Sequence, residues 1–224
     1  METLKLKIVS IVLAEIFEND LDLKKHIITQ ADMLFCQYGI KSVTMDDIAR
    51  HLGMSKKTIY LHFSDKNALV VEMMRDRMEN QVCVMDDCCS QSTDAVNEVF
   101  FAVTQMQYML SKMNPMLFYD LQKYHPEAWQ YFVTFREKKL FGVIYSNLKR
   151  GIAEGYYRKE INADILTWMR IGQIDNVFNQ TTYPANQFNI AQLMTETMEH
   201  FLYGICTLKG HKLINKYKQI TEED

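Results

Sequence analysis

Residues 55–63 of this 224-residue chain bring lysine, threonine and tyrosine side chains together at helical spacing. If the segment is a helix with Ile59 toward the core, a rotation of about 100° per residue turns Lys57 away from the core, with Thr58 and Tyr60 beside it. Lysine can donate to guanine O6 and N7, threonine can contact a thymine methyl group, and tyrosine can donate to a phosphate. These residue types predict a surface that reads the major groove of DNA.

An ordinary solvated surface would also account for the lysine pair at 56–57, and the flanking helices decide between the two interpretations. Thr44 and Asp47 stand at the spacing of a helix-capping box, and Gly53 is placed to end that helix. Ser55 then caps the helix that carries the lysines. Two short helices joined by a tight glycine-containing turn form a helix-turn-helix, whose second helix lies in the major groove.

A longer helix precedes this pair and supplies its packing surface. From Leu23 an apolar stripe recurs at the spacing of an amphipathic helix, and it comprises Ile27, Ala31, Leu34, Phe35 and Tyr38. Gly39 is placed to end this helix. Residues 1–22 are predicted to form an N-terminal arm or a further short helix. Their longest apolar stretch falls short of the ~20 residues that span a bilayer, and acidic residues follow it where a signal-peptide cleavage site would stand.

The composition predicts an all-α fold and excludes several enzyme classes. The chain holds 8 glycines and 3 prolines, too few turn residues for a sandwich, a barrel or a many-stranded α/β fold. No two glycines lie closer together than Gly151 and Gly155, so the glycine-rich turns that bind dinucleotides or nucleotide phosphates are absent. The 5 scattered cysteines form no C-x-x-C pair, which argues against a zinc site or a disulfide scaffold. They predict a reducing, cytoplasmic location and no cofactor.

The segment 23–66 is basic although the whole chain is acidic. It holds seven lysine and arginine residues against four aspartates, whereas the formal net charge of the chain is -3. A basic segment on an acidic body is the pattern that a local polyanion-binding unit leaves in a sequence. The charge supports the geometric argument for DNA without deciding it alone.

The same residues carry a family resemblance. The runs VTMDDIA (43–49), GMSKKTIY (53–60), HF (62–63) and DK (65–66) resemble the DNA-binding domain of the TetR family, and the similarity extends over about 23–74. The resemblance implies a ligand-responsive bacterial transcription regulator, which we expect to be a repressor that binds a palindromic operator as a homodimer. The few charges in the apolar stripes of the second domain predict that the effector that releases it is small and mostly hydrophobic. It implies phosphate contacts by Thr44, Tyr60, His62 and Lys66, and contacts at or near base edges by Lys56, Lys57 and Thr58, with Ser55 in the same interface.

Two departures from the family pattern bear on the DNA target. Lys57 stands where many relatives have glycine, so the operator sequence cannot be taken from them. The 22 residues before the first helix exceed the usual arm, and contact with DNA or an upstream start codon are both open explanations. His51 and His62 could serve as ligands or general bases, but neither has a partner nearby in sequence, so surface exposure for His51 and phosphate contact for His62 are the simpler interpretations.

The sequence divides into a DNA-binding domain over 23–68 and a larger effector-binding and dimerisation domain over 69–224. Asp65 caps a connector helix that runs to about Asp86, and residues 86–92 break the apolar period, which predicts a loop. The adjacent Cys88 and Cys89 could form a redox or metal sensor, but no basic residue nearby lowers a thiol pKa, so a structural role is the simpler interpretation. Further helices are predicted over 93–113, 115–124, 126–154, 162–180 and 189–208, with Pro115 and Pro126 in first turns and a solvated tail over 209–224.

Fifteen methionines are unusually many, and several gather with aromatic residues in the second domain. Flexible thioethers beside aromatic rings can line an adaptable apolar pocket, although each of these residues could instead pack in a core. The candidate ligand-binding residues are Met106, Met109, Met113, Phe118, Trp129, Phe132, Trp168 and Met169.

The helix over 189–208 keeps one apolar phase over four turns, and the helix over 162–180 does much the same. Two such stripes can form a four-helix bundle with their symmetry copies. The family resemblance assigns the dimer interface there, and the candidate residues are Leu193, Met194, Thr197, Phe201, Leu202 and Ile205.

A function of one other class stays open, whereas an enzyme is not expected. A helical carrier or adaptor could bind a hydrophobic ligand in the same pocket without touching DNA. An enzyme would need a nucleophile with its base, or two differently placed carboxylates, around a cleft. His125, His200 and His211 have no such partners at meaningful spacing, so no catalytic residue is predicted.

Overall fold

The computed structural model describes residues 2–114 and 116–220, with the side chains of the first helix described from Asp20 onward. Over these residues the regular elements are helices, which confirms the all-α prediction. The N-terminal unit comprises α1 (Glu2–Tyr38), α2 (Met45–Leu52) and α3 (Lys56–His62). The body comprises α4 (Lys66–Gln91), α5 (Ala95–Leu110), α6 (Leu117–Tyr124), α7 (Pro126–Phe135), the π-helical turn η1 (Arg136–Leu140), α8 (Phe141–Ala153), α9 (Ala163–Val177), α10 (Ile190–Ile205) and α11 (Leu208–Lys218). Within the same described ranges, no helix combines the length and the hydropathy that crossing a bilayer requires.

The N-terminal unit begins and ends its helices where the sequence signals predict. Thr44 Oγ1 accepts a hydrogen bond from the backbone N–H of Asp47, and the Asp47 carboxylate accepts one from the backbone N–H of Thr44, which completes the capping box. Gly53 ends α2 with a φ of 63°, in the left-handed region that favours glycine. Ser55 caps α3 by accepting from the backbone N–H of Thr58. The predicted helix-turn-helix is therefore present.

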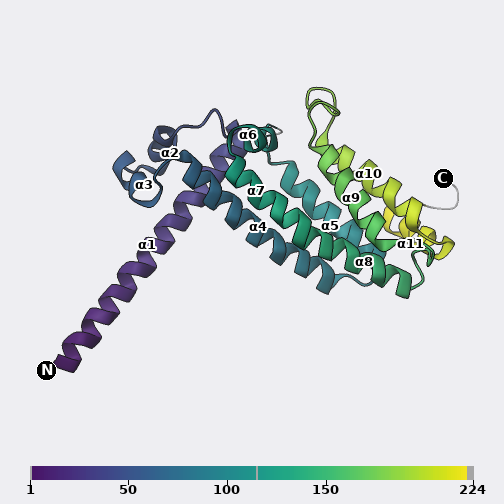
Figure 1. The fold of residues 1–224 in the computed structure, drawn as a ribbon, viewed down its shortest axis with the longest axis horizontal. Coiled ribbons are helices and arrows are strands. Elements are labelled where there is room, and N and C mark those ends of the chain that lie inside the picture. Colours follow the sequence, from purple (N-terminus) through teal and green to yellow (C-terminus); the bar gives the residue numbers. More distant parts are fainter. Residues whose placement is uncertain (1, 115, 221–224) are drawn as a thin grey trace.

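The prediction of a separate arm or helix over residues 1–22 is wrong for the described part of that segment. α1 runs without a break from Glu2 to Tyr38, so residues 2–22 extend the first helix of the N-terminal unit. No glycine or proline occurs before Gly39 to interrupt the helix. Figure 1 shows this extension leading away from the body.

The long helix α4 connects the N-terminal unit to the body. The loop predicted over 86–92 is wrong, because α4 continues to Gln91 and the chain turns only at 92–94, before Asp94 caps α5. The polar run interrupts the apolar period on the solvent side alone, whereas Cys88 on the inner side is buried. The apolar period did not reveal the last turns of α4, because the buried residue on their inner face is a single cysteine, Cys88.

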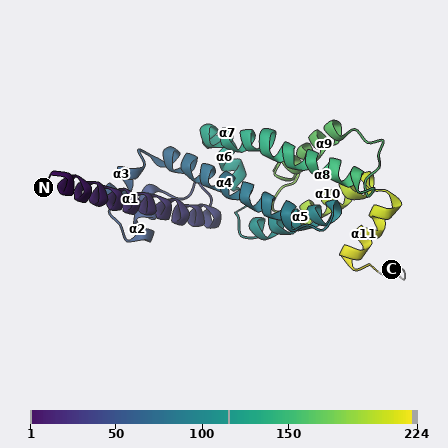
Figure 2. The same ribbon diagram turned by 90° about the horizontal axis from the view of Figure 1, so that it is seen from below.

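The body is a layered helical bundle built on α4. α5 and α7 pack against α4, and α8 packs against α5 and α9. Figures 1 and 2 show α4, α5, α7 and α8 running alongside one another, with α9, α10 and α11 toward the end of the molecule far from α3. The core of the N-terminal unit continues into the body through Leu117, Leu121 and Ala128, so the two parts share one apolar cluster.

Two further helix predictions need correction. Residues 126–154 form α7, η1 and α8 rather than one uniform α-helix, because the chain widens into a π-helical turn at 136–140. The tail predicted to be solvated instead forms α11 over 208–218, whose buried Ile214 belongs to the apolar cluster beside α5. Pro126 lies in the first turn of α7 as predicted, whereas Pro115 lies outside the described residues.

Candidate DNA interface and ligand cavity

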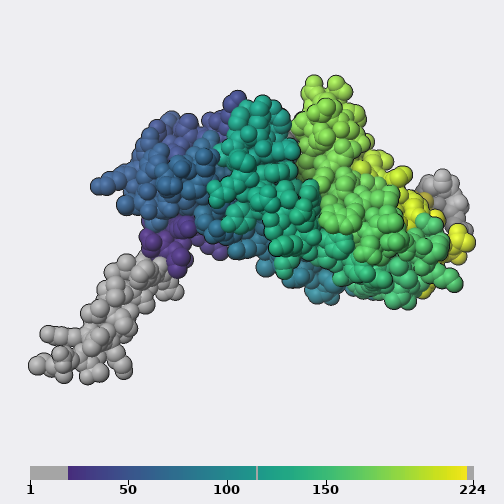
Figure 3. All heavy atoms as spheres, in the orientation of Figure 1, coloured from purple at the N-terminus to yellow at the C-terminus, as the bar shows by residue number. Residues whose placement is uncertain are grey.

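The helix α3 presents the face that its sequence predicts. Ile59 and Phe63 are buried in the core of the N-terminal unit, while Lys57 is exposed and the neighbouring Leu61 is 75% exposed. Among the described residues, no ion pair engages Lys57. Figures 1 and 3 show α3 at the end of the molecule opposite α11, clear of the body. The geometry leaves the lysine-bearing face open to a partner.

Lys56 and Tyr60 form a second group on α3. The Lys56 Nζ atom lies 2.9 Å from a carboxylate oxygen of Asp46 on α2 and 5.9 Å from the centroid of the Tyr60 ring. The hydrogen bond to Asp46 raises the pKa of Lys56. Because exposed ion pairs are weak, a phosphate or a base edge can compete with Asp46 for the ammonium group.

The hydroxyl groups of Thr44, Ser55 and Thr58 are engaged in helix caps. Ser55 Oγ lies 2.8 Å from Thr58 Oγ1, and Thr44 Oγ1 donates to the Asp47 carboxylate at 2.6 Å. These bonds from Thr44 lower the pKa of Asp47. The caps fix the starts of α2 and α3, so these residues set the orientation of the recognition helix. Their contacts with DNA stay predictions.

Lys66 and His62 turn toward the protein rather than toward solvent. Lys66 Nζ donates to the backbone carbonyl of Ile40 at 2.5 Å, and burial lowers the pKa of Lys66. The His62 side chain is 8% exposed, and its Nδ1 lies 3.7 Å from the carboxylate of Asp20 on α1. These contacts engage one donor of the Lys66 ammonium group and one ring nitrogen of His62, and the phosphate contacts of both side chains stay predictions.

A large cavity lies where the N-terminal unit meets the body. Its volume is about 700 Å³, within the range that holds a drug-sized molecule. Five predicted ligand-binding residues line it, namely Met106, Met109, Met113, Phe118 and Phe132. Side chains from α1 and α4 complete the wall, including Met33, Cys36 and Met74. Thioether and aromatic groups dominate the lining, as the methionine-rich sequence predicts, and ligand binding itself stays a prediction.

Three candidate ligand-binding residues do not line this cavity. The Trp129 ring packs against the Phe132 ring, with centroids 5.0 Å apart, and only Phe132 of the two is among the residues that line the cavity. Trp168 and Met169 are 51% and 55% exposed on the outer face of α9, because the inner face of that helix carries Ile171 and Ile174 instead. The assignment of Trp168 and Met169 to the pocket is therefore corrected.

Arg77 is a cavity residue that the sequence analysis missed. Its guanidinium group donates to Asp32 at 2.7 Å and to the Cys36 sulfur at 2.6 Å, both on α1, and to the Met113 sulfur at 3.5 Å. Burial raises the pKa of Asp32, which the charge of Arg77 partly offsets. The sequence held one signal for this role: Arg77 is a charged residue that continues the helical spacing of the apolar Leu69 and Met73. Arg77 joins the N-terminal unit to the body at the cavity wall.

The predicted dimer residues on α10 face inward. Met194, Phe201, Leu202 and Ile205 are buried, and Leu193 and Thr197 are half-buried. The apolar stripe of α10 packs on α5 and α9 of the same chain. The regular spacing of its apolar residues therefore indicates a helix that packs in the core of a single subunit. The outer face of α9 instead exposes Ile165, Trp168 and Met169, and Trp168 packs 5.1 Å from the Phe141 ring of α8.

Comparison with known proteins agrees with the helix-turn-helix. Residues 27–73 match the model of the bacterial regulatory proteins of the tetR family. This segment of the chain is therefore a TetR-type DNA-binding domain. The HTH-type transcriptional regulator YvaF of Bacillus subtilis (strain 168) is 25% identical over 182 residues, which cover 81% of this chain and 94% of YvaF. The HTH-type transcriptional repressor KstR2 of Mycolicibacterium smegmatis is 23% identical over 153 residues, covering 63% of this chain and 74% of KstR2.

Solved structures of transcriptional regulators share the fold of both parts. The transcriptional regulator FadR from Bacillus subtilis, solved in complex with stearoyl-CoA, has a TM-score of 0.63 and 18% identity, and covers 80% of this chain and 97% of FadR. The TetR-type helix-turn-helix is thus followed here by a helical domain of the kind seen in these regulators. The relatives are transcriptional regulators rather than enzymes.

Proposed function

We propose that this TetR-family protein is a ligand-controlled repressor that binds a palindromic operator as a dimer and leaves it when a small, mostly apolar effector enters the cavity. The observation that carries the proposal is the composition of the cavity wall. α1 packs on α2 and lines the cavity together with α4, α5, α7 and α9. A molecule in the cavity therefore touches the DNA-binding unit and the body at once.

The ion pair at Arg77 supplies the coupling in this proposal. An effector that separates Arg77 from Asp32 and Cys36 releases α1 from α4, and α2 and α3 move with α1. In a dimer that reads half-sites one helical turn apart, the two copies of α3 must lie ~34–36 Å from each other. A shift of a few ångströms is enough to lose that match.

The outer face of α9 supports the dimer. Ile165, Trp168 and Met169 are more than half exposed, and contiguous exposed apolar surface of this kind marks association sites. A symmetric pair would bury this face against its copy. The relatives support the remaining parts of the proposal, since KstR2 is named a repressor and FadR was solved with an acyl ligand.

Selection from a random oligonucleotide pool tests the proposal. The wild-type chain is expected to select a palindrome, and Lys57→Ala is expected to relax the preference at a defined position in each half-site, at about 1–3 kcal/mol for the selected base. Lys138→Ala removes an equal charge from an exposed site on η1 and should leave the consensus unchanged. A chain that forms no salt-sensitive, sequence-selective complex would instead be a carrier or adaptor.

A further inference from the structure

Arg170 on α9 is a buried charge without an acidic partner. The residue is 5% exposed, and no carboxylate of the described residues lies within ion-pair distance of it. Its Nη1 donates to the Thr197 carbonyl at 3.1 Å and to Gln173 Oε1 at 3.4 Å, and its guanidinium lies 5.3 Å from the Phe201 ring centroid. Burial lowers the pKa of Arg170 to about 10. These contacts hold the Arg170 side chain in place, but no acidic group among the described residues neutralises its positive charge.

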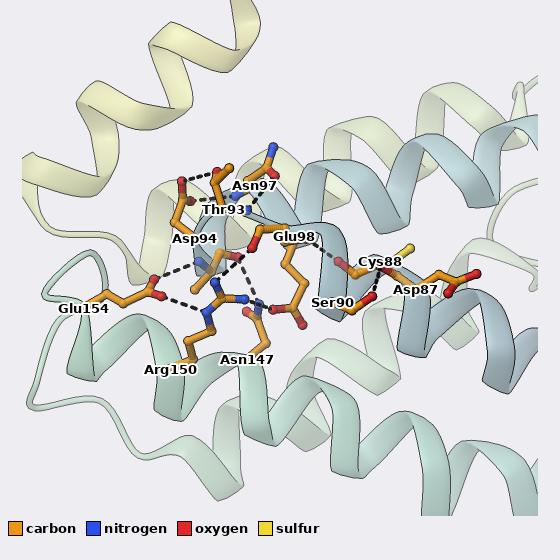
Figure 4. Close-up of polar contacts among 12 residues, drawn as sticks. Asp87, Cys88, Ser90, Thr93, Asp94, Asn97, Glu98, Asn147, Arg150 and Glu154 are labelled. Carbon is orange, nitrogen blue, oxygen red and sulfur yellow. Dashed lines mark hydrogen bonds and ion pairs between the residues drawn. The ribbon is translucent and has the colours of Figure 1, made fainter.

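Other arginines of the body pair with acids. Arg150 contacts Glu98 at 3.1 Å and Glu154 at 2.7 Å, and Arg136 contacts Asp175 at 2.6 Å. Figure 4 shows Arg150 between Glu98 and Glu154. Glu98 is the acid that shares a cavity wall with Arg170, and its ion pair with Arg150 already uses its charge. The contrast makes Arg170 a charge that the described residues leave uncompensated.

Arg170 lines a small cavity of about 120 Å³. The surrounding wall is mostly apolar and includes Val99, Val103, Ile144 and Met194. The small cavity shares Val84, Met85, Met106 and Ile174 with the wall of the 700 Å³ cavity. Arg170 is thus part of the wall of a mostly apolar space that adjoins the larger cavity.

A buried, unpaired charge destabilises the fold unless another group neutralises it. The planar guanidinium donates two parallel hydrogen bonds that match a carboxylate. We propose that Arg170 anchors the effector, and that the effector is an aliphatic carboxylic acid whose carboxylate pairs with Arg170 while its chain occupies the larger cavity. This inference rests on the proposed function, because it names the chemical class of the effector for the same cavity.

The test compares dodecanoate with dodecanol, which has the same chain length and no charge, by calorimetric titration into the full-length chain. The wild-type chain is expected to bind dodecanoate at least tenfold more tightly than dodecanol. Arg170→Met is expected to remove that preference while binding of dodecanol stays the same, and Arg170→Lys is expected to keep part of it. Lys149→Met removes a positive charge from the exposed side of α8 and should keep the full preference.

Thermal unfolding gives an independent readout. Because Arg170→Met replaces an uncompensated buried charge with an apolar side chain, this variant is expected to melt at a higher temperature than the wild type without ligand. A wild type that prefers the alcohol, or an Arg170→Met variant with unchanged selectivity for the acid, would overturn the proposal. DNA binding is measured separately, so a chain that binds the acid through Arg170 but ignores DNA refutes the repressor function and leaves the anchor standing.

Discussion

The caps that define the helix-turn-helix and the polar network around Arg150 in the body span very different distances along the chain. In the N-terminal unit, Thr44 bonds to Asp47 and Ser55 bonds to Thr58, three residues apart. In the body, Arg150 reaches Glu98 across 52 residues, and the Tyr157 hydroxyl donates to the Ala95 carbonyl across 62 residues. Contacts of the first kind can be predicted from the local sequence, whereas those of the second kind form only when the helices pack together.

The same difference separates the two functional surfaces. The exposed face of α3 follows from the phase of one short helix between two caps, so it is set by a few neighbouring residues. The cavity depends on the packing of helices from both parts of the molecule. Changes in the N-terminal unit are therefore expected to act locally, and changes in the body to act through distant partners.

The largest expected effect tests the phase of α3. Ile59→Ala should lower the free energy of unfolding by about 2–5 kcal/mol, because Ile59 is fully buried. Leu61→Ala removes a similar side chain two residues away and should change stability by less than about 0.5 kcal/mol, because Leu61 points to solvent. Urea unfolding followed by circular dichroism measures both. Equal effects would mean that α3 faces the other way and that Lys57 does not lie on its outer surface.

The next largest effect tests a long-range contact in the body. A Cβ atom on Gly151 would lie 2.1 Å from a ring carbon of Tyr157. That ring cannot shift easily because its hydroxyl is held by Ala95 and Asn147. Gly151→Ala is therefore expected to destabilise the chain by about 1–3 kcal/mol in denaturant titrations.

Gly142→Ala is the matched control on the same helix. A Cβ atom on Gly142 would meet nothing within 4 Å, so alanine should stabilise α8 by up to about 1 kcal/mol through its higher helix propensity. The two substitutions are identical and differ only in what surrounds them. If both alanine substitutions stabilise the chain, the Tyr157 ring does not pack against Gly151 of α8.

The sequence predicted the N-terminal unit well because its signals are local. The caps at Thr44 and Ser55 and the turn at Gly53 were each expected at the residue where they occur. The cavity was predicted only in part, since Met106 and Phe118 line it but Arg77 and Asp32 were not foreseen. Their pairing joins residues 45 positions apart and leaves no periodic pattern.

The dimer prediction shows a second limit. A helical stripe shows that one face is buried but not which surface covers it. The stripe that includes Phe201 and Leu202 on α10 is covered by the chain's own helices, whereas the exposed Trp168 on α9 was assigned to the pocket. Only the packed structure separates an internal face from one that is free to meet a partner.

The smallest expected effect tests the capping box itself. Thr44→Ala removes the hydroxyl that accepts from the Asp47 N–H at 3.2 Å, and it should cost about 0.5–2 kcal/mol of stability. Thr104→Ala is the control, because Thr104 is an exposed helical threonine whose hydroxyl donates to the carbonyl of Phe100 on its own helix. Alanine at that position should be neutral or slightly stabilising. A similar loss in both variants would mean that the cap adds nothing beyond helix propensity.

The pH dependence sharpens this last comparison. Since its bonds with Thr44 lower the pKa of Asp47 in the folded chain, the box contributes stability above the ordinary carboxylate pKa, and the contribution is lost as the pH falls through the lowered pKa. The stability difference between wild type and Thr44→Ala should therefore shrink on acidification, while the difference for Thr104→Ala should stay constant. Chemical denaturation at a series of pH values measures both. A Thr44→Ala difference that does not change with pH would show that the ionised Asp47 carboxylate is not part of the cap, and α2 would then depend on packing for its start, as α6 and α7 do, which begin without a side-chain cap.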